Sequence, residues 1–172
     1  GGGRVGLSGA GYRGRGGGIR AVGDEACCTE NGLAPTITPE PPFTRYRVDE
    51  LEILRGDFFD LRPEQVADVT ALFDRAALIA LPPALRTRYA RHLQVLLPKA
   101  VSGLLISLDY DQAERAGPPF AVTEPEVRAL FAERFGLTEL AVLDLFATNP
   151  RYRAQGLTRM VERVYGLRPF QT

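Results

Sequence analysis

The chain has 172 residues, a length typical of one domain, and its 45% hydrophobic and 24% charged residues are typical of a globular protein. Its 21 basic and 21 acidic residues cancel, which excludes a strong overall field that would attract nucleic acid or a membrane surface. No apolar run approaches the roughly 20 residues needed to span a bilayer, and no signal-peptide pattern opens the sequence, so we expect a cytoplasmic protein. One histidine and two adjacent cysteines argue against a disulfide framework and a transition-metal site.

The sequence divides into two unlike parts. Residues 1–32 hold 12 of the 18 glycines and show neither helical nor strand periodicity. We therefore predict that residues 1–29 form a poorly packed or disordered Gly/Arg-rich head and that residues 30–172 form the folded core. Within the head, Leu7–Gly11 is a weak match to a cofactor-binding glycine loop, because no solid strand precedes it. Tyr12–Gly18 could alternatively bind single-stranded nucleic acid through its arginines.

The core alternates predicted strands with predicted helices. Leu51–Leu54 and Val69–Phe73 are short strands, and Pro63 opens a helical turn between them. Leucines and a tyrosine then recur at helical spacing, which predicts an amphipathic helix over residues 84–97. Gly103–Leu108 is a continuous apolar run, typical of a central strand buried on both faces.

The last third of the sequence predicts one helix and two strands. Thr123 followed by Glu126 matches a capping box, and the apolar periodicity after it extends the helix to about Phe135. Leu137–Phe146 and Met160–Leu167 predict an antiparallel strand pair at the end of the sheet. Together the elements predict an α/β layered fold with a mostly parallel sheet.

Polar residues follow each of the core strands. Gly56–Leu61 follows the first strand, and its aspartate and phenylalanine could contact a ribose and a purine; a turn with an aspartate cap and two core phenylalanines is the alternative. Asp74 and Arg75 follow the second strand, where Arg75 could orient an anionic group or form a structural ion pair with Asp74.

The central strand is followed by a polar group and a proline-rich loop. Asp109–Gln112 places polar side chains after this strand, and Gly117–Phe120 forms a stiff apolar loop that could wall a flat substrate. A solvated loop with a proline-rich turn is the alternative. Because ligands of α/β proteins bind at the carboxyl ends of parallel strands, the three groups together predict a ligand site at this edge.

The order and spacing of these segments resemble the bacterial thiopurine S-methyltransferase family. The resemblance covers residues 30–168. The segments that carry it are Glu30–Pro35, Gly56–Leu61, Asp74–Pro83, Leu108–Gln112, Gly117–Phe120, Asn149–Tyr152, Gly156–Thr158 and Val164–Tyr165.

This resemblance implies a Rossmann-like class I methyltransferase that uses S-adenosylmethionine. The implied substrate is an aromatic or heterocyclic thiol such as a thiopurine, with selenium or tellurium species as further acceptors. A thiolate needs little general-base help, so no catalytic acid or base is assigned. The residues that match family positions are Arg75 at the cofactor and substrate, Asp57 and Phe58 beside the adenine, and Pro118, Pro119 and Arg151 at the substrate.

The head departs from the family pattern. Members of the family have a strand, a glycine-containing cofactor loop and a helix where this sequence has the Gly/Arg-rich residues 1–29, so we expect the first strand and helix to be degraded or absent. An inactive remnant of the methyltransferase fold and a Gly/Arg-mediated RNA-binding module are therefore alternatives, although the neutral net charge disfavours nucleic acid. We expect a monomer whose partner is a small-molecule thiol.

Overall fold

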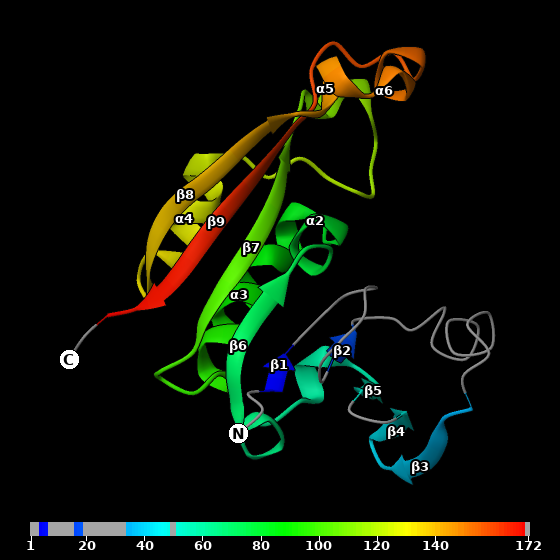
Figure 1. Cartoon of the computed structure of the whole chain (residues 1–172), viewed down its shortest axis with the longest axis vertical. Helices are drawn as coiled ribbons and strands as arrows, with labels where there is room; N and C mark the ends of the chain where they lie inside the picture. The colour runs from blue at the N-terminus through cyan, green and yellow to red at the C-terminus, as the bar shows by residue number, and fades with distance from the viewer. Residues whose placement is uncertain (1–3, 7–15, 19–33, 49–50, 171–172) are drawn as a thin grey trace.

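The computed structural model describes residues 4–6, 16–18, 34–48 and 51–170. Its larger sheet has five strands in the order β1-β6-β7-β9-β8 (Figure 1). The first three strands in this order run parallel, and β9 and β8 are antiparallel to their neighbours. Their bounds are β1 Arg4–Gly6, β6 Val69–Asp74, β7 Ser102–Asp109, β9 Val161–Pro169 and β8 Phe135–Asp144.

Two helices cover one face of this sheet. Helix α3 (Pro83–Leu96) begins with a proline in its first turn, and its buried stripe includes Tyr89 and Leu93. Helix α4 (Glu124–Phe131) buries Val127 and Phe131. These stripes share one apolar core with inward-facing side chains of β7 and β9, and Figure 1 shows both helices on the same side of the sheet.

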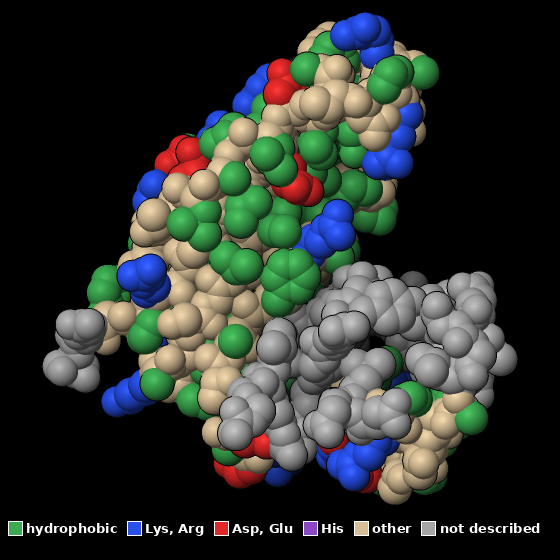
Figure 2. Space-filling model, in the orientation of Figure 1, with side chains coloured by type: hydrophobic (Ala, Val, Ile, Leu, Met, Phe, Trp, Pro, Cys, Tyr) green, Lys and Arg blue, Asp and Glu red, His purple; other side chains and the backbone are tan. Residues whose placement is uncertain are grey.

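The opposite face of β7, β9 and β8 carries exposed apolar side chains. Leu104, Leu140 and Leu143 are 39%, 56% and 45% exposed, and we call these three the open face. Leu140 lies over Gly166 of β9, which pairs with Leu104, so the open face is continuous across three strands. Figure 2 shows apolar side chains gathered over this part of the molecule.

A second sheet has four strands in the order β2-β5-β4-β3. The hairpin of β3 (Thr36–Glu40) and β4 (Phe43–Val48) turns at Pro41-Pro42, and β4 pairs with β5 (Leu51–Arg55). Strand β2 (Gly16–Gly18) lies parallel to β5. Strand β5 was predicted from the sequence, whereas β3 and β4 were not, because arginines, threonines and prolines replace an apolar alternation there.

The short elements lie mainly in the connections. They are 3₁₀ turns η1 Phe58–Asp60, η2 Pro63–Val66 and η3 Gln112–Glu114, and helices α2 Ala77–Ala80, α5 Leu145–Thr148 and α6 Pro150–Ala154. Among the described residues, no helix has both the length and the apolar character that a membrane span requires.

The structure confirms the α/β layout and corrects one expectation. Within the head it describes only the short strands β1 and β2, because glycine-rich backbone can pair with a neighbouring strand without any side-chain periodicity; most other head residues lie outside the described ones, so the poorly packed or disordered head stays a prediction. The predicted capping box does not form. Thr123 is the N-cap residue of α4 but its side chain makes no capping hydrogen bond, and Glu126 pairs with Arg86 instead.

Candidate functional site

Strands β1, β6 and β7 end at the same edge of the sheet. Because they are parallel, their carboxyl ends at Gly6, Asp74 and Asp109 point the same way. Two of the three polar groups predicted to form a ligand site follow β6 and β7 directly, whereas the first, Gly56–Leu61, follows β5 of the second sheet, so the prediction that all three end at one sheet edge is wrong for that group. The topology therefore brings these segments to one edge, where α/β folds bind ligands.

Asp74 is buried at the end of β6 and serves the local structure. Its carboxylate accepts hydrogen bonds from the backbone nitrogens of Ala77 and Leu78, at 3.0 and 3.3 Å, and from the Tyr89 hydroxyl at 2.8 Å. Burial raises the pKa of the Asp74 carboxyl, and burial together with Asp74 raises that of Tyr89. The alternative of an Asp74–Arg75 ion pair is thus wrong, because Asp74 turns inward toward α2 and α3.

Arg75 lies at the rim of the same edge. Its side chain is exposed, and within the described part of the chain it has neither an ion pair nor a hydrogen bond. An unpaired guanidinium beside strand ends is available to an anionic or polar ligand. Its predicted contact with cofactor and substrate stays a prediction.

Asp57 and Phe58 take structural positions. Asp57 caps η1 by accepting a 2.9 Å hydrogen bond from the Phe59 nitrogen. Phe58 is buried, with its ring 5.1 Å from the rings of both Tyr89 and His92. This arrangement matches the alternative of a capped turn with a core phenylalanine, and the predicted contact with adenine stays a prediction.

The proline-rich loop is fastened to the residue after β7 and to helix α2. The Tyr110 hydroxyl donates to the Pro119 carbonyl at 2.6 Å, and the Phe120 nitrogen donates to the Ile79 carbonyl at 2.6 Å. Gly117 has a φ of 76°, and a Cβ there would lie 2.5 Å from the Phe120 ring, so only glycine fits. The loop is therefore held next to the Arg75–α2 segment.

Gln112 ties the same loop together from within. Its amide nitrogen donates to the Tyr110 hydroxyl and to the carbonyl of Arg115, and its amide oxygen accepts from the Ala121 nitrogen. The polar group predicted after the central strand thus positions the loop.

A cavity of about 220 Å³ lies between this loop and α6. It brings together Pro119 and Arg151, two residues predicted to contact substrate, but it is not lined by Arg75, Asp57, Phe58 or Pro118. Arg151 donates to the Tyr152 hydroxyl at 2.9 Å and lies over the Tyr152 ring. The lining residues are Leu108, Arg115, Pro119, Arg151, Tyr152, Gln155 and Met160.

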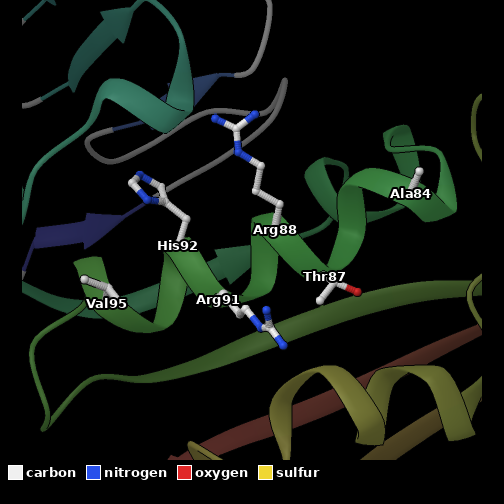
Figure 3. A pocket seen from close by; sticks show the side chains of 6 residues that line it. All are labelled: Ala84, Thr87, Arg88, Arg91, His92 and Val95. Carbon is white, nitrogen blue, oxygen red and sulfur yellow. The ribbon is translucent and has the colours of Figure 1, made fainter.

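A larger hollow of about 520 Å³ runs along α3 (Figure 3). Its labelled side chains, from Ala84 to Val95, all come from this one helix. His92 is within 3.0 Å of the Phe58 carbonyl, and Arg88 lies 3.7 Å above the Phe59 ring, so both side chains fasten η1 to the helix. We therefore place the candidate site at the smaller cavity, which has walls from several segments.

Acidic groups near the candidate site already have partners. Asp109 accepts from Arg159 and Arg163, and the hydrogen bond from Arg159 is the main cause of a lowered Asp109 pKa. Glu114 accepts from the backbone nitrogen and the hydroxyl of Thr158. Among the described residues, no three His, Cys, Asp or Glu side chains gather in a way that could hold a metal ion.

Two arginines near the site were not predicted from the sequence. Arg86 is buried on α3 and donates to the carbonyl of Leu81 and to Glu126. Arg115 lines the small cavity. Arg86 lies on the same helical stripe as Tyr89 and Leu93, a signal that could have marked it as buried. Nothing in the sequence around Arg115 distinguishes it from an ordinary loop arginine.

Solved structures share this fold. A SAM-dependent methyltransferase from Anabaena variabilis matches with a TM-score of 0.57 and 11% identity, covering 91% of this chain and 68% of that one. Another match is a 1,6-didemethyltoxoflavin-N1-methyltransferase from Burkholderia thailandensis, whose structure holds 1,6-didemethyltoxoflavin and S-adenosylhomocysteine. It matches with a TM-score of 0.56 and 14% identity, covering 98% of this chain and 72% of that one. The likeness confirms the predicted class I methyltransferase fold.

Sequence relatives agree with the resemblance found in the motifs. Thiopurine S-methyltransferase of Pseudomonas fluorescens SBW25 is 50% identical over 143 residues, which are 83% of this chain and 66% of that protein. The enzyme of the same name from Nitrosospira multiformis is 43% identical over 141 residues, 82% of this chain and 64% of that protein. This chain thus spans slightly less than two thirds of these relatives. The thiopurine S-methyltransferase (TPMT) family model matches residues 18–169, so the chain belongs to that family.

Proposed function

We propose that this chain transfers the methyl group of S-adenosylmethionine to the sulfur of a small aromatic or heterocyclic thiol of the thiopurine type. Selenium and tellurium species are further acceptors within this proposal. We also propose that it acts as a cytoplasmic monomer. The observation that carries the proposal is the small cavity that unites Pro119 and Arg151 next to the carboxyl edge of a methyltransferase-type sheet.

The cofactor side of the proposal is supported by the edge shared by β1 and β6. Arg75 is exposed there without a partner among the described residues, as a ligand-binding arginine would be. Strand β1 ends at Gly6 beside β6, so the strand that normally precedes a cofactor loop is present in short form. We propose that Arg75 contacts the cofactor, with Asp57 and Phe58 shaping the neighbouring region.

The substrate side is supported by the chemistry of the cavity. Pro119, Leu108 and Met160 supply apolar walls for a flat ring, and Arg151 supplies a fixed positive charge. Pro118, which precedes Pro119 in the same loop, would extend this wall. The hydrogen bonds of Tyr110 and Gln112 keep the loop in place before any ligand enters.

The proposed reaction requires orientation more than acid–base chemistry. Bound S-adenosylmethionine would supply an activated methyl group on a sulfonium. The guanidinium of Arg151 favours the thiolate form of an acceptor because an adjacent positive charge lowers a thiol pKa. The apolar walls exclude water from the sulfur, and the cavity holds the ring in one orientation, which lowers the entropic part of the barrier. No residue acts as a general base in this proposal.

The test is a calorimetric titration of the purified chain with S-adenosylhomocysteine, after circular dichroism has verified that the chain is folded. Saturable binding, followed by methyl transfer to a thiopurine, is the expected result. A folded chain that neither binds S-adenosylhomocysteine nor methylates a thiol would overturn the proposal in favour of an inactive remnant. RNA binding that weakens steeply with salt, and is lost without residues 1–29, would favour the RNA-binding alternative.

A further inference from the structure

The candidate cavity carries two positive charges and no negative one. Arg115 and Arg151 both line it, and its other lining residues are neutral. The acidic side chains that flank it, Asp109 and Glu114, accept hydrogen bonds from Arg159, Arg163 and Thr158. Figure 2 shows basic side chains at the end of the molecule that carries α5 and α6. The surroundings of the cavity therefore favour a negatively charged occupant.

The two arginines differ in how they are held. Arg151 has a hydrogen bond to the Tyr152 hydroxyl and stacks on the ring of that residue. Arg115 is half-buried, and its guanidinium has no ion pair, hydrogen bond or ring contact within the part of the chain that the structure describes. Its backbone carbonyl accepts a hydrogen bond from Gln112, which fixes where the side chain starts. A half-buried guanidinium with unused donors is a site for a carboxylate, which it can bind through two parallel hydrogen bonds.

We propose that Arg115 is a specificity residue that selects aromatic thiols bearing a carboxylate. This inference rests on the proposed function, because it assigns Arg151 to the sulfur end of the acceptor and Arg115 to its carboxylate end. The volume of about 220 Å³ lies below the ~300–1,000 Å³ of pockets for drug-sized ligands, so it suits one ring with one small anionic substituent. A neutral thiol of the same shape would leave the donors of Arg115 unpaired on binding.

The test compares two acceptors of nearly equal size, 4-sulfanylbenzoate and 4-sulfanylbenzamide, with S-adenosylmethionine as donor. The wild-type chain should prefer the acid by kcat/KM, and Arg115→Met should lower that preference by about tenfold or more, the loss of about 1.4 kcal/mol of discrimination. Arg115→Lys should keep part of the preference for the acid, because lysine supplies the positive charge without the planar guanidinium that forms two parallel hydrogen bonds. Arg153→Met is the control, since Arg153 is a neighbouring exposed arginine on α6 that does not line the cavity.

A second measurement separates this inference from the proposed function. The methylated products, 4-(methylsulfanyl)benzoate and its amide, are titrated into the wild type and the same three variants by calorimetry. Methyl transfer to both acceptors with a preference that Arg115→Met leaves unchanged would overturn the inference and leave the proposed function standing. Tighter binding of the acid that depends on Arg115, in a chain that transfers no methyl group, would support the anion site and overturn the proposed function. No transfer and equal binding of acid and amide would overturn both.

Discussion

Arg86 and Glu126 join the two helices that cover the sheet. Nη1 of Arg86 donates to both carboxylate oxygens of Glu126, at 2.7 and 2.8 Å, and the two residues are 40 positions apart in the sequence. The Arg86 side chain is 2% exposed and that of Glu126 is 33% exposed. The pair is thus a largely buried salt bridge between α3 and α4.

Breaking this bridge from one side should be costly. Glu126→Ala leaves the buried guanidinium of Arg86 without its carboxylate, and we expect a loss of about 3 kcal/mol, the lower end for buried pairs because Glu126 is partly exposed. The double variant Arg86→Met/Glu126→Ala should lose less than Glu126→Ala alone. Urea denaturation, monitored by circular dichroism, measures the free energy of unfolding of both variants. Glu133→Ala is the control, because Glu133 is exposed. A double variant less stable than either single one would show that the arginine stabilises the fold by packing instead.

The buried Asp74 carboxyl should make stability depend on pH. Burial raises its pKa above the ordinary value, so the folded state disfavours the ionised form. The contribution of Asp74 to stability is then largest below about pH 4, the pKa in the unfolded chain, and declines as the pH rises through the folded pKa. The free energy of unfolding of wild type minus that of Asp74→Asn should therefore fall between about pH 4 and pH 7.

Urea titrations of both proteins across this range measure that difference. Tyr89→Phe is a useful companion, because it removes the hydrogen bond to Asp74 while keeping the ring that packs on Phe58. A difference that grows toward neutral pH would mean that the hydrogen bonds to the carboxylate outweigh its burial, contrary to the prediction.

Arg75 should matter for binding and little for folding. Its exposed side chain has no partner among the described residues, so Arg75→Ala should change stability by no more than about 0.5 kcal/mol. Binding of S-adenosylhomocysteine, in contrast, should weaken by about tenfold or more. Calorimetry and thermal denaturation separate the two effects, and Arg168→Ala at the far end of β9 is the matched control. Unchanged affinity would remove Arg75 from the proposed site.

Gln112 should control the order of the proline-rich loop. Gln112→Ala removes both donor bonds and the acceptor bond to Ala121, while Gln112→Glu keeps an acceptor and loses the donors. We expect faster backbone hydrogen exchange at residues 113–121 in both variants, with the larger effect in Gln112→Ala. The KM for the thiol should rise while affinity for S-adenosylhomocysteine stays close to wild type. Exchange rates that do not change would show that Tyr110 holds the loop alone.

The sequence predicted the fold better than the site. Strand β7 and helix α3 were predicted because their apolar patterns are long and regular, but β7 is not buried on both faces as expected, since Leu104 is 39% exposed. The capping box at Thr123 failed because a buried guanidinium on another helix competes for Glu126, and no local pattern encodes a contact so distant in sequence. Strands β1 and β2 were missed because glycine-rich backbone carries no side-chain signal.

The site shows the same division between local and distant information. Pro119 and Arg151 were named separately, and their meeting at one cavity depends on how α6 folds back after β8. Phe58 could not be assigned to core or ligand from its own segment, because the choice depends on Tyr89 and His92 from α3. The role of such residues depends on neighbours that are distant in the sequence.

The open face has a practical consequence for following the unfolding of this protein. Dyes such as ANS become fluorescent on exposed apolar surface, and the folded chain already presents Leu104, Leu140 and Leu143 to solvent. A dye-monitored melting curve should therefore start from a bright native baseline, which resembles the signal of a partly denatured sample. The chain has six tyrosines and no tryptophan, so far-UV circular dichroism and tyrosine fluorescence are the methods suited to tracking its folded fraction.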